Sequence, residues 1–172
     1  MVRTLHQSDS IKHTAVGFGV TAGATLKSGD RGDDIRAMLT AGQGLGRYLA
    51  ANFISSSVQE ADGRLNTTPS INGYVAYNHF WTPKKLSSSF SASFFRAFHD
   101  DALAGATINQ TAYSLSGNIK WDIVSVLRVG LEYMLGYRET LDGTDGYFHR
   151  VQLAAKYVFG YHNEVADEKR SY

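Results

Sequence analysis

The sequence has no cysteine, only 2 prolines among 172 residues, and no apolar run long enough to form a transmembrane helix. Without cysteine, the chain has no disulfide framework, no thiolate metal ligand and no cysteine nucleophile. A transmembrane helix needs about 18 or more consecutive apolar residues, so a bundle of such helices is excluded. The formal net charge is only +1, which gives no basis for nucleic-acid binding.

Charged residues are also scarce, at 19%, whereas aromatic residues reach 12%. The opening stretch MVRTLHQSDSIKHT lacks the apolar core of a secretory signal peptide. If the protein is exported, we expect its export signal to lie outside this sequence.

The stretch LRVGLEYMLGY, Leu127 to Tyr137, alternates apolar or aromatic residues with small and charged ones. A period of two indicates a β-strand whose two faces meet different environments. Its length matches the roughly 9–11 residues that a tilted strand needs to cross a bilayer. The same alternation predicts seven antiparallel strands, at residues 12–27, 34–43, 71–81, 86–98, 111–122, 127–137 and 147–159.

The connections between these strands alternate between short and long, as they do in outer-membrane barrels. Aromatic residues near the strand ends are typical of the girdles at membrane interfaces. These residues are Trp81, Trp121, Tyr137, Tyr147, Tyr157 and Phe159. A soluble β-sandwich requires neither feature, so we predict an all-β, antiparallel transmembrane β-barrel.

The number of strands indicates part of a larger barrel. Counting back from Phe159 places the start of the first strand on the outer side, whereas single-chain bacterial barrels have even strand numbers and both ends in the periplasm. The segment VRTLHQSD is too short and polar to span. We therefore expect three regions: residues 1–11 as a polar lead-in or truncated outer loop, 12–159 as barrel strands with a long outer loop at 44–70, and 160–172 as a polar tail.

Several segments resemble the C-terminal half of the DcaP-like porins of Gram-negative outer membranes. They are GFGVTAGATLKSGD, GQGLGRYLAANFIS, LNTTPSINGYVAYNHFWTPK and GLEYMLGYRETLDGTDGYFHRVQLAAKYVF. The resemblance implies a trimeric, sixteen-stranded channel for small anionic solutes such as dicarboxylates, embedded in outer-membrane lipid and lipopolysaccharide and needing no cofactor. We expect the N-terminal half of such a barrel to lie outside this sequence, which is one departure from that pattern. The sequence also departs after Phe159, where GYHNEVADEKRSY follows the usual terminal aromatic residue; this tail either hinders assembly or is a periplasmic extension.

The polar faces of the predicted strands carry more cationic than anionic residues. The cations are Lys27, Arg36, Lys120, Arg128, Arg138, Arg150 and Lys156, and the anions are Asp34, Asp122 and Glu132. Arginine or lysine rings favour anions in a pore, and guanidinium groups bind carboxylates through two hydrogen bonds. As pore-lining or solute-binding residues we predict Arg36, Lys120, Arg128, Glu132, Arg138 and Arg150. The alternative is that these charges pair across neighbouring strands, for example Arg128 or Arg138 with Glu132, and only stiffen the wall.

The long segment 44–70 exceeds an ordinary turn, and long insertions usually have a function or lack order. Leu45, Leu49 and Phe53 have the spacing of a short helix folded against or into the lumen. Such a helix would place Arg47 or Arg64 at a constriction. The alternative is a surface or trimer-contact loop.

Other functions have weaker support from the sequence. His99 precedes two aspartates at a strand end and is the best candidate for a barrel enzyme, but no serine nucleophile accompanies it. Metal-ligand spacings are also missing. We expect a porin that works by passive diffusion and is not an enzyme. The competing hypotheses are a structural or adhesive barrel with a plugged lumen and, third, an outer-membrane enzyme.

Overall fold

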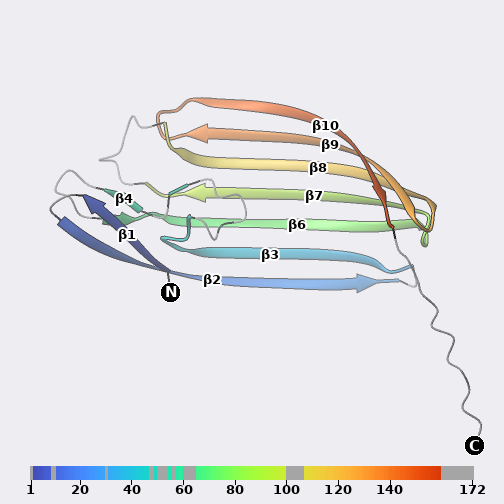
Figure 1. Cartoon of the computed structure of the whole chain (residues 1–172), viewed down its shortest axis with the longest axis horizontal. Helices are drawn as coiled ribbons and strands as arrows, with labels where there is room; N and C mark the ends of the chain where they lie inside the picture. Colours follow the sequence, from blue (N-terminus) through green and yellow to red (C-terminus); the bar gives the residue numbers. More distant parts are fainter. Residues whose placement is uncertain are drawn as a thin grey trace, which may run out of the picture.

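The computed structural model describes residues 2–8, 11–29, 31–46, 49, 54–55, 57–59, 65–99 and 107–159. These residues form ten strands, and eight of the strands make one continuous antiparallel sheet in the order β1-β2-β3-β6-β7-β8-β9-β10 (Figure 1). Strands β4 and β5 form a separate hairpin. The bounds are β1 Val2–Ser8, β2 Ile11–Ser28, β3 Asp33–Gln43, β4 Ser57–Gln59, β5 Leu65–Thr67, β6 Pro69–Thr82, β7 Leu86–Ala97, β8 Asn109–Val124, β9 Leu127–Thr140 and β10 Asp145–Tyr157.

The seven strands predicted from the period of two are confirmed as β2, β3 and β6 to β10. The predicted all-β, antiparallel fold is confirmed with them. Strand β1 lies within the region expected to be a lead-in and pairs only with residues 11–17 of β2. The second part of β2, residues 18–28, pairs with β3. Consequently β1 does not extend along the full length of the sheet.

The two long connections of the sheet lie at one of its ends (Figure 1). Turns of a few residues join β2 to β3, β6 to β7 and β8 to β9 at one end, which we call the short-turn end. The long connections, from β3 to β6 and from β7 to β8, lie at the opposite, long-loop end together with the β9–β10 turn. The alternation predicted from the sequence holds from the β2–β3 turn to the β8–β9 turn, but the β9–β10 turn, residues 141–144, is as short as the β2–β3 turn, residues 29–32.

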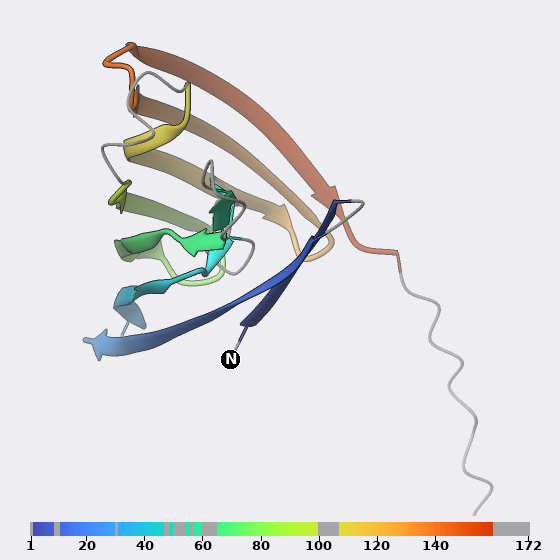
Figure 2. The same ribbon diagram turned by 90° about the vertical axis from the view of Figure 1, so that its left-hand side faces the viewer.

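The sheet is a single curved layer with a convex and a concave face (Figure 2). Its strand pairs match apolar positions with apolar ones, such as Ala92 with Leu115 and Leu131 with Leu153. These apolar side chains are exposed, and the exposed fraction reaches 74% at Val20 and 80% at Leu153. An exposed apolar surface of this extent indicates a membrane or a partner rather than water.

A small apolar cluster lies where the β3–β6 connection folds onto the sheet. Its buried members are Leu45, Leu49, Ile54, Phe95, Ala97 and Ala112. Phe95 and Ala112 are paired across β7 and β8 on the face opposite the apolar one, so the connection packs on the concave face. Figure 2 shows the short strand β4 on this side of the sheet.

Two glycines allow Leu45 to approach the wall. A Cβ atom added at Gly19 would lie 2.8 Å from both Leu45 methyl carbons, and one at Gly42 would lie 3.0 Å from Leu45 Cδ1. The distance at Gly19 is shorter than real Cβ atoms show, and the distance at Gly42 is tighter than most real Cβ contacts. The glycines at positions 19 and 42 therefore serve close packing of the loop against the sheet.

Within the described residues the sheet is not closed. β10 pairs only with β9, and residues 18–28 of β2 pair only with β3. The prediction of sixteen strands therefore stays a prediction. In the part of the chain that the structure covers, no helix is long and apolar enough to cross a membrane.

Candidate functional site

A chain of hydrogen bonds crosses the concave face near the short-turn end. Arg36 binds Asp34 through two bonds of 2.7 and 3.1 Å, and Asn78 donates to the same carboxylate at 2.8 Å. Ser89 donates to Asn78 at 2.5 Å, and Lys120 donates to Ser89 at 2.9 Å. These five side chains come from β3, β6, β7 and β8, so the network ties four strands together through their polar face.

Two further arginines of this face form ion pairs. Arg128 binds Asp122 through two bonds of 2.6 and 3.0 Å, because the two residues are directly opposite in the β8–β9 register. The Arg150 Nη2 atom on β10 lies 2.9 Å from the Glu132 Oε1 atom on β9. Pairing across neighbouring strands, the alternative raised by the sequence, is thus found for Arg128 and Arg150, whereas Arg36 pairs with Asp34 of its own strand. The partner of Arg128 is Asp122 rather than Glu132.

Arg138 differs from these three arginines because it has no ion pair among the residues that the structure describes. Its neighbours across the strands are Ala112 on β8 and Gly146 on β10. Neither of these directly opposite neighbours has a side chain that could accept a hydrogen bond from the guanidinium.

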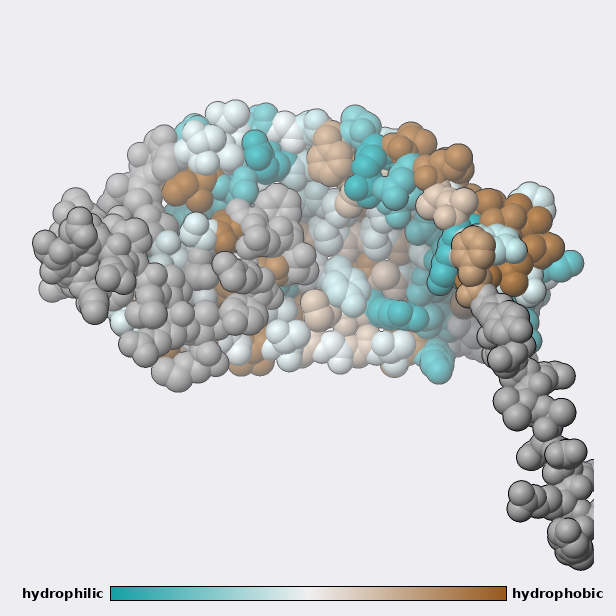
Figure 3. Space-filling view, viewed as in Figure 1, coloured by the Kyte–Doolittle hydropathy of each residue, from teal (hydrophilic) through white to brown (hydrophobic). Residues whose placement is uncertain are grey.

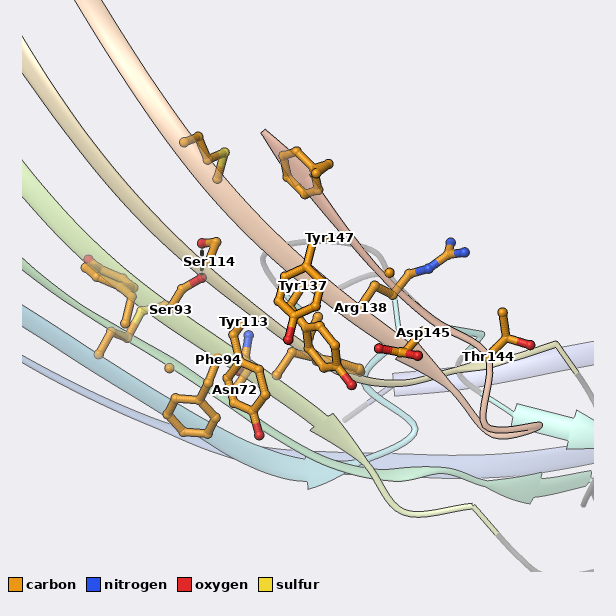
Figure 4. Close-up of a pocket in the computed structure, with 18 residues that line it drawn as sticks. Asn72, Ser93, Phe94, Tyr113, Ser114, Tyr137, Arg138, Thr144, Asp145 and Tyr147 are labelled. Atoms are coloured by element: carbon orange, nitrogen blue, oxygen red, sulfur yellow. Dashed lines mark hydrogen bonds between the residues drawn. The ribbon is translucent and has the colours of Figure 1, made fainter. Parts of the chain in front are cut away.

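Arg138 lines a hollow of about 660 Å³ at the long-loop end (Figure 4). The lining includes Phe95 from β7, Phe148 from β10 and Asn72 from β6. The Asn72 side chain is buried, at 7% exposure, and its Oδ1 atom has no hydrogen-bond partner within the described part of the chain. Ser93 and Ser114, joined by a 2.7 Å hydrogen bond, form part of the floor. A view onto the concave side shows polar and apolar residues intermixed over the sheet (Figure 3).

The predicted constriction residues Arg47 and Arg64 lie outside the described residues, as does Phe53. Leu45 and Leu49, two described residues of the same loop, are buried in the apolar cluster on the concave face. Gly46 between them is in a 3-10 conformation, and the Leu49 amide donates to the Gly46 carbonyl oxygen at 3.2 Å. Most of the segment lies outside the described residues, so the short helix stays a prediction.

His99 forms a hydrogen bond from Nε2 to the carbonyl oxygen of Asn109, 3.0 Å away. A carbonyl oxygen only accepts, so Nε2 carries the proton and is not available as a base. Asp100 and Asp101 lie outside the described residues. Within the described residues, no three His, Asp or Glu side chains are placed to hold a metal ion.

Aromatic residues cluster on the convex face at both ends of the sheet. At the short-turn end, the Trp81 indole donates to Ser88 at 2.9 Å and its ring packs edge-on against His79 with centroids 4.4 Å apart. At the long-loop end, Tyr137 contacts Tyr113 and Tyr147, with ring centroids 5.9 and 4.8 Å apart. Such rings place an apolar body and a polar tip side by side, as membrane interfaces require.

A one-layer antiparallel sheet with an apolar convex face, a polar concave face and aromatic bands at both ends has the design of a transmembrane β-barrel wall. The chain is similar in structure to the outer-membrane channel DcaP of Acinetobacter baumannii, with a TM-score of 0.76 and 25% sequence identity over 85% of the chain. The predicted resemblance to the DcaP-like porins is thereby confirmed.

The chain spans 42% of the length of that channel. No protein-family model and no curated protein sequence matches the chain. Which half of the channel corresponds to this chain therefore remains the sequence prediction.

Proposed function

We propose that this chain forms part of the wall of an outer-membrane channel through which small anionic solutes diffuse passively. The observation that carries the proposal is the set of cationic side chains on the concave face, among which Arg138 has no carboxylate partner in the described residues. Structural similarity to an outer-membrane channel supports the porin-like role. Dicarboxylates are the solutes that the resemblance to this channel family implies.

The mechanism requires no covalent step and no cofactor. An anion entering a low-dielectric barrel loses hydration, and fixed cations along its path offset part of that loss. The ion pairs of Arg36, Arg128 and Arg150 hold their guanidinium groups in place, whereas Arg138 offers an uncompensated charge at the long-loop end. In this proposal the convex face contacts outer-membrane lipid and lipopolysaccharide, and the channel assembles as a homotrimer.

One observation favours a second candidate, a structural barrel with a plugged lumen. The β3–β6 connection packs on the concave face through Leu45, Leu49 and Ile54, which narrows the space in front of the wall. A plugged barrel would carry no steady current, and this property separates the two candidates.

The proposal is tested by single-channel recording of the protein isolated from its native membrane. In a gradient of KCl, we expect steady conductance and a reversal potential showing preference for chloride. Arg138→Gln should shift this potential toward potassium, because it removes a cation with no paired carboxylate. Arg128→Gln is the matched control. It removes a cation that is paired with Asp122 and leaves that carboxylate without its counter-ion, so it measures how the breaking of an ion pair changes the reversal potential.

Cation preference in the wild-type channel would contradict the anion hypothesis. A folded channel that carries no current would contradict diffusion and support the plugged barrel. Succinate entry into proteoliposomes, followed by their osmotic swelling, tests the dicarboxylate part separately.

A further inference from the structure

We propose that a polar cluster on the convex face, at the short-turn end, binds the headgroup of a phospholipid that carries an ethanolamine group. The cluster, which we call the interfacial cluster, consists of Asp33 on β3 and Tyr77, His79 and Trp81 on β6. The inference rests on the proposed contact of the convex face with lipid. It goes beyond the solute path, because it concerns the opposite face of the sheet.

Asp33 carries a charge on the apolar face of the sheet. Side chains two residues apart in a strand share a face, and Ile35 is one of the exposed apolar residues of the convex face. The Asp33 carboxylate accepts hydrogen bonds from the His79 Nδ1 atom at 2.7 Å and the Tyr77 hydroxyl at 3.0 Å. The Phe80 amide donates to it at 2.9 Å. Ionisable groups within membrane-spanning segments are costly and generally mark functional sites, so this carboxylate indicates a polar ligand at the membrane surface.

The Asp33 carboxylate can take up one more hydrogen-bond donor. Among the described residues its Oδ1 atom accepts one hydrogen bond, from the Phe80 amide, whereas a carboxylate oxygen has room for two. The Asp33 side chain stays 17% exposed. Its partners are a backbone amide, a hydroxyl group and an imidazole that donates in its neutral form, so the carboxylate keeps its negative charge. A cationic donor such as an ammonium group therefore complements it.

Trp81 provides a second group that attracts an ammonium. Its ring packs edge-on against His79 with centroids 4.4 Å apart, and its indole nitrogen donates to Ser88 at 2.9 Å, which holds the ring in place. Because His79 contacts both Asp33 and Trp81, the carboxylate and the indole flank one imidazole. The Trp81 ring is exposed. Tryptophan rings attract cations through their faces and lie at the level of lipid headgroups.

Cations on the adjoining turns complement the phosphate of the same headgroup. Arg31 lies in the β2–β3 turn, and Lys84 and Lys85 lie in the β6–β7 turn, all of them exposed. These two turns adjoin at the short-turn end because β3 and β6 are antiparallel neighbours. Short turns lie on the periplasmic side of outer-membrane barrels, in the leaflet that contains phospholipids. A carboxylate beside cations matches a headgroup in which an ammonium follows a phosphate.

The test is native mass spectrometry of the protein isolated from its native membrane, stripped of lipid in detergent and offered equal amounts of three phospholipids. The probes share their dioleoyl chains and differ in the headgroup: ethanolamine, choline, which has no N–H donor, and glycerol, which has no cation. We expect the ethanolamine lipid to bind about tenfold better than the choline lipid, for one charge-assisted hydrogen bond. The glycerol lipid should bind no better than the choline lipid.

Variants assign the preference to the interfacial cluster. Asp33→Asn keeps an acceptor for the Phe80 amide and should reduce the preference for ethanolamine over choline to less than about twofold. Arg31→Gln and Lys84→Gln should weaken binding of both lipids and leave their ratio unchanged, because both lipids carry the phosphate. Glu139→Gln is the matched control, since it removes a carboxylate at the other end of the sheet, on β9, and should change neither quantity.

Equal binding of the ethanolamine and choline lipids by the wild-type protein would overturn the inference, and this result needs no variant. An unchanged ratio in a folded Asp33→Asn protein would overturn it as well. Strongest binding of the glycerol lipid would show that the turns only attract anionic lipid. Binding of none of the three would overturn the inference together with the lipid contact on which it rests. Failure of the anion channel shows in a different quantity, the reversal potential.

Discussion

At the scale of single residues, the side chains around an arginine determine whether its charge is paired with a carboxylate. The guanidinium of Arg128 is matched by a carboxylate directly opposite it, Asp122, while the positions opposite Arg138 are Ala112 and Gly146. Both residues were predicted from the sequence as inward cations. Their difference depends on the register between strands, and a period of two within each strand does not determine that register.

The same limit explains which residues the sequence did not identify. Asn78 and Ser89 join the hydrogen-bond network because they pair across β6 and β7, and Asn72 matters because it lines the hollow. Each is an ordinary polar residue at an inward position. The sequence indicated only that these residues face inward, and many other residues of the strands face inward as well.

The β9–β10 turn contains an aspartate with a clear acid response. Hydrogen bonds from the Thr140 hydroxyl at 2.5 Å and the Thr144 amide at 3.0 Å lower the pKa of Asp142 to about 2. Because its pKa is lower in the folded protein, the Asp142 carboxyl group stabilises the fold at pH values above 3.8, its pKa in the unfolded chain. This contribution is lost as the pH falls toward about 2, its pKa in the folded protein.

We therefore expect the NMR shift of the Thr144 amide to titrate with a midpoint near pH 2 in detergent-solubilised protein. Asp142→Asn should abolish this titration. A midpoint near 3.8 in the wild type would show that the turn does not hold the carboxylate.

At the scale of elements, strand periodicity predicted the long strands well, since each has one face in an apolar environment over more than ten residues. It failed for β4 and β5, whose three residues each are too few to show a period. It also failed for β1, where Val2–Ser8 has no consistent apolar face. These short strands are specified by their partners rather than by their own pattern.

The contact between the β3–β6 connection and the wall gives a prediction at this scale. Leu45→Ala should lower the free energy of unfolding by about 2 kcal/mol or more, because it empties a closely packed site against Gly19 and Gly42. The measurement is denaturant unfolding in detergent micelles. Leu153→Ala, at a position 80% exposed on the convex face, is the matched control and should cost less than about 1 kcal/mol. Equal losses would show that the connection is not anchored at Leu45.

At the scale of the whole molecule, the convex surface is the feature that an aqueous environment does not explain. Composition could not reveal it, because the polar face of each strand cancels the apolar one in the mean hydropathy of −0.24. Alternation recovered it, and the sequence therefore predicted the antiparallel all-β architecture and the face of each strand that carries the apolar side chains. The open edges of the sheet show why the strand number of the complete barrel could not be derived in the same way.

If the convex face contacts lipid, charge there should be far more harmful than charge on the concave face. Leu131→Arg, near the middle of β9, should destabilise the protein in lipid vesicles by about 2–4 kcal/mol. Gln152→Arg is the control, because Gln152 lies opposite Glu132 on the concave face, and it should be close to neutral. Urea titration in vesicles measures both, and equal costs would argue against lipid contact.

The strict residue-by-residue opposition of β8, β9 and β10 also constrains how this coding sequence can evolve. Loss of a single codon within β9 would turn every side chain beyond that point to the other face and carry Arg138 from the concave side to the apolar side. Loss of two adjacent codons would preserve the faces. Natural length variation should therefore be concentrated in the long connections between β3 and β6 and between β7 and β8, and any variation within the strands should come in even numbers of residues.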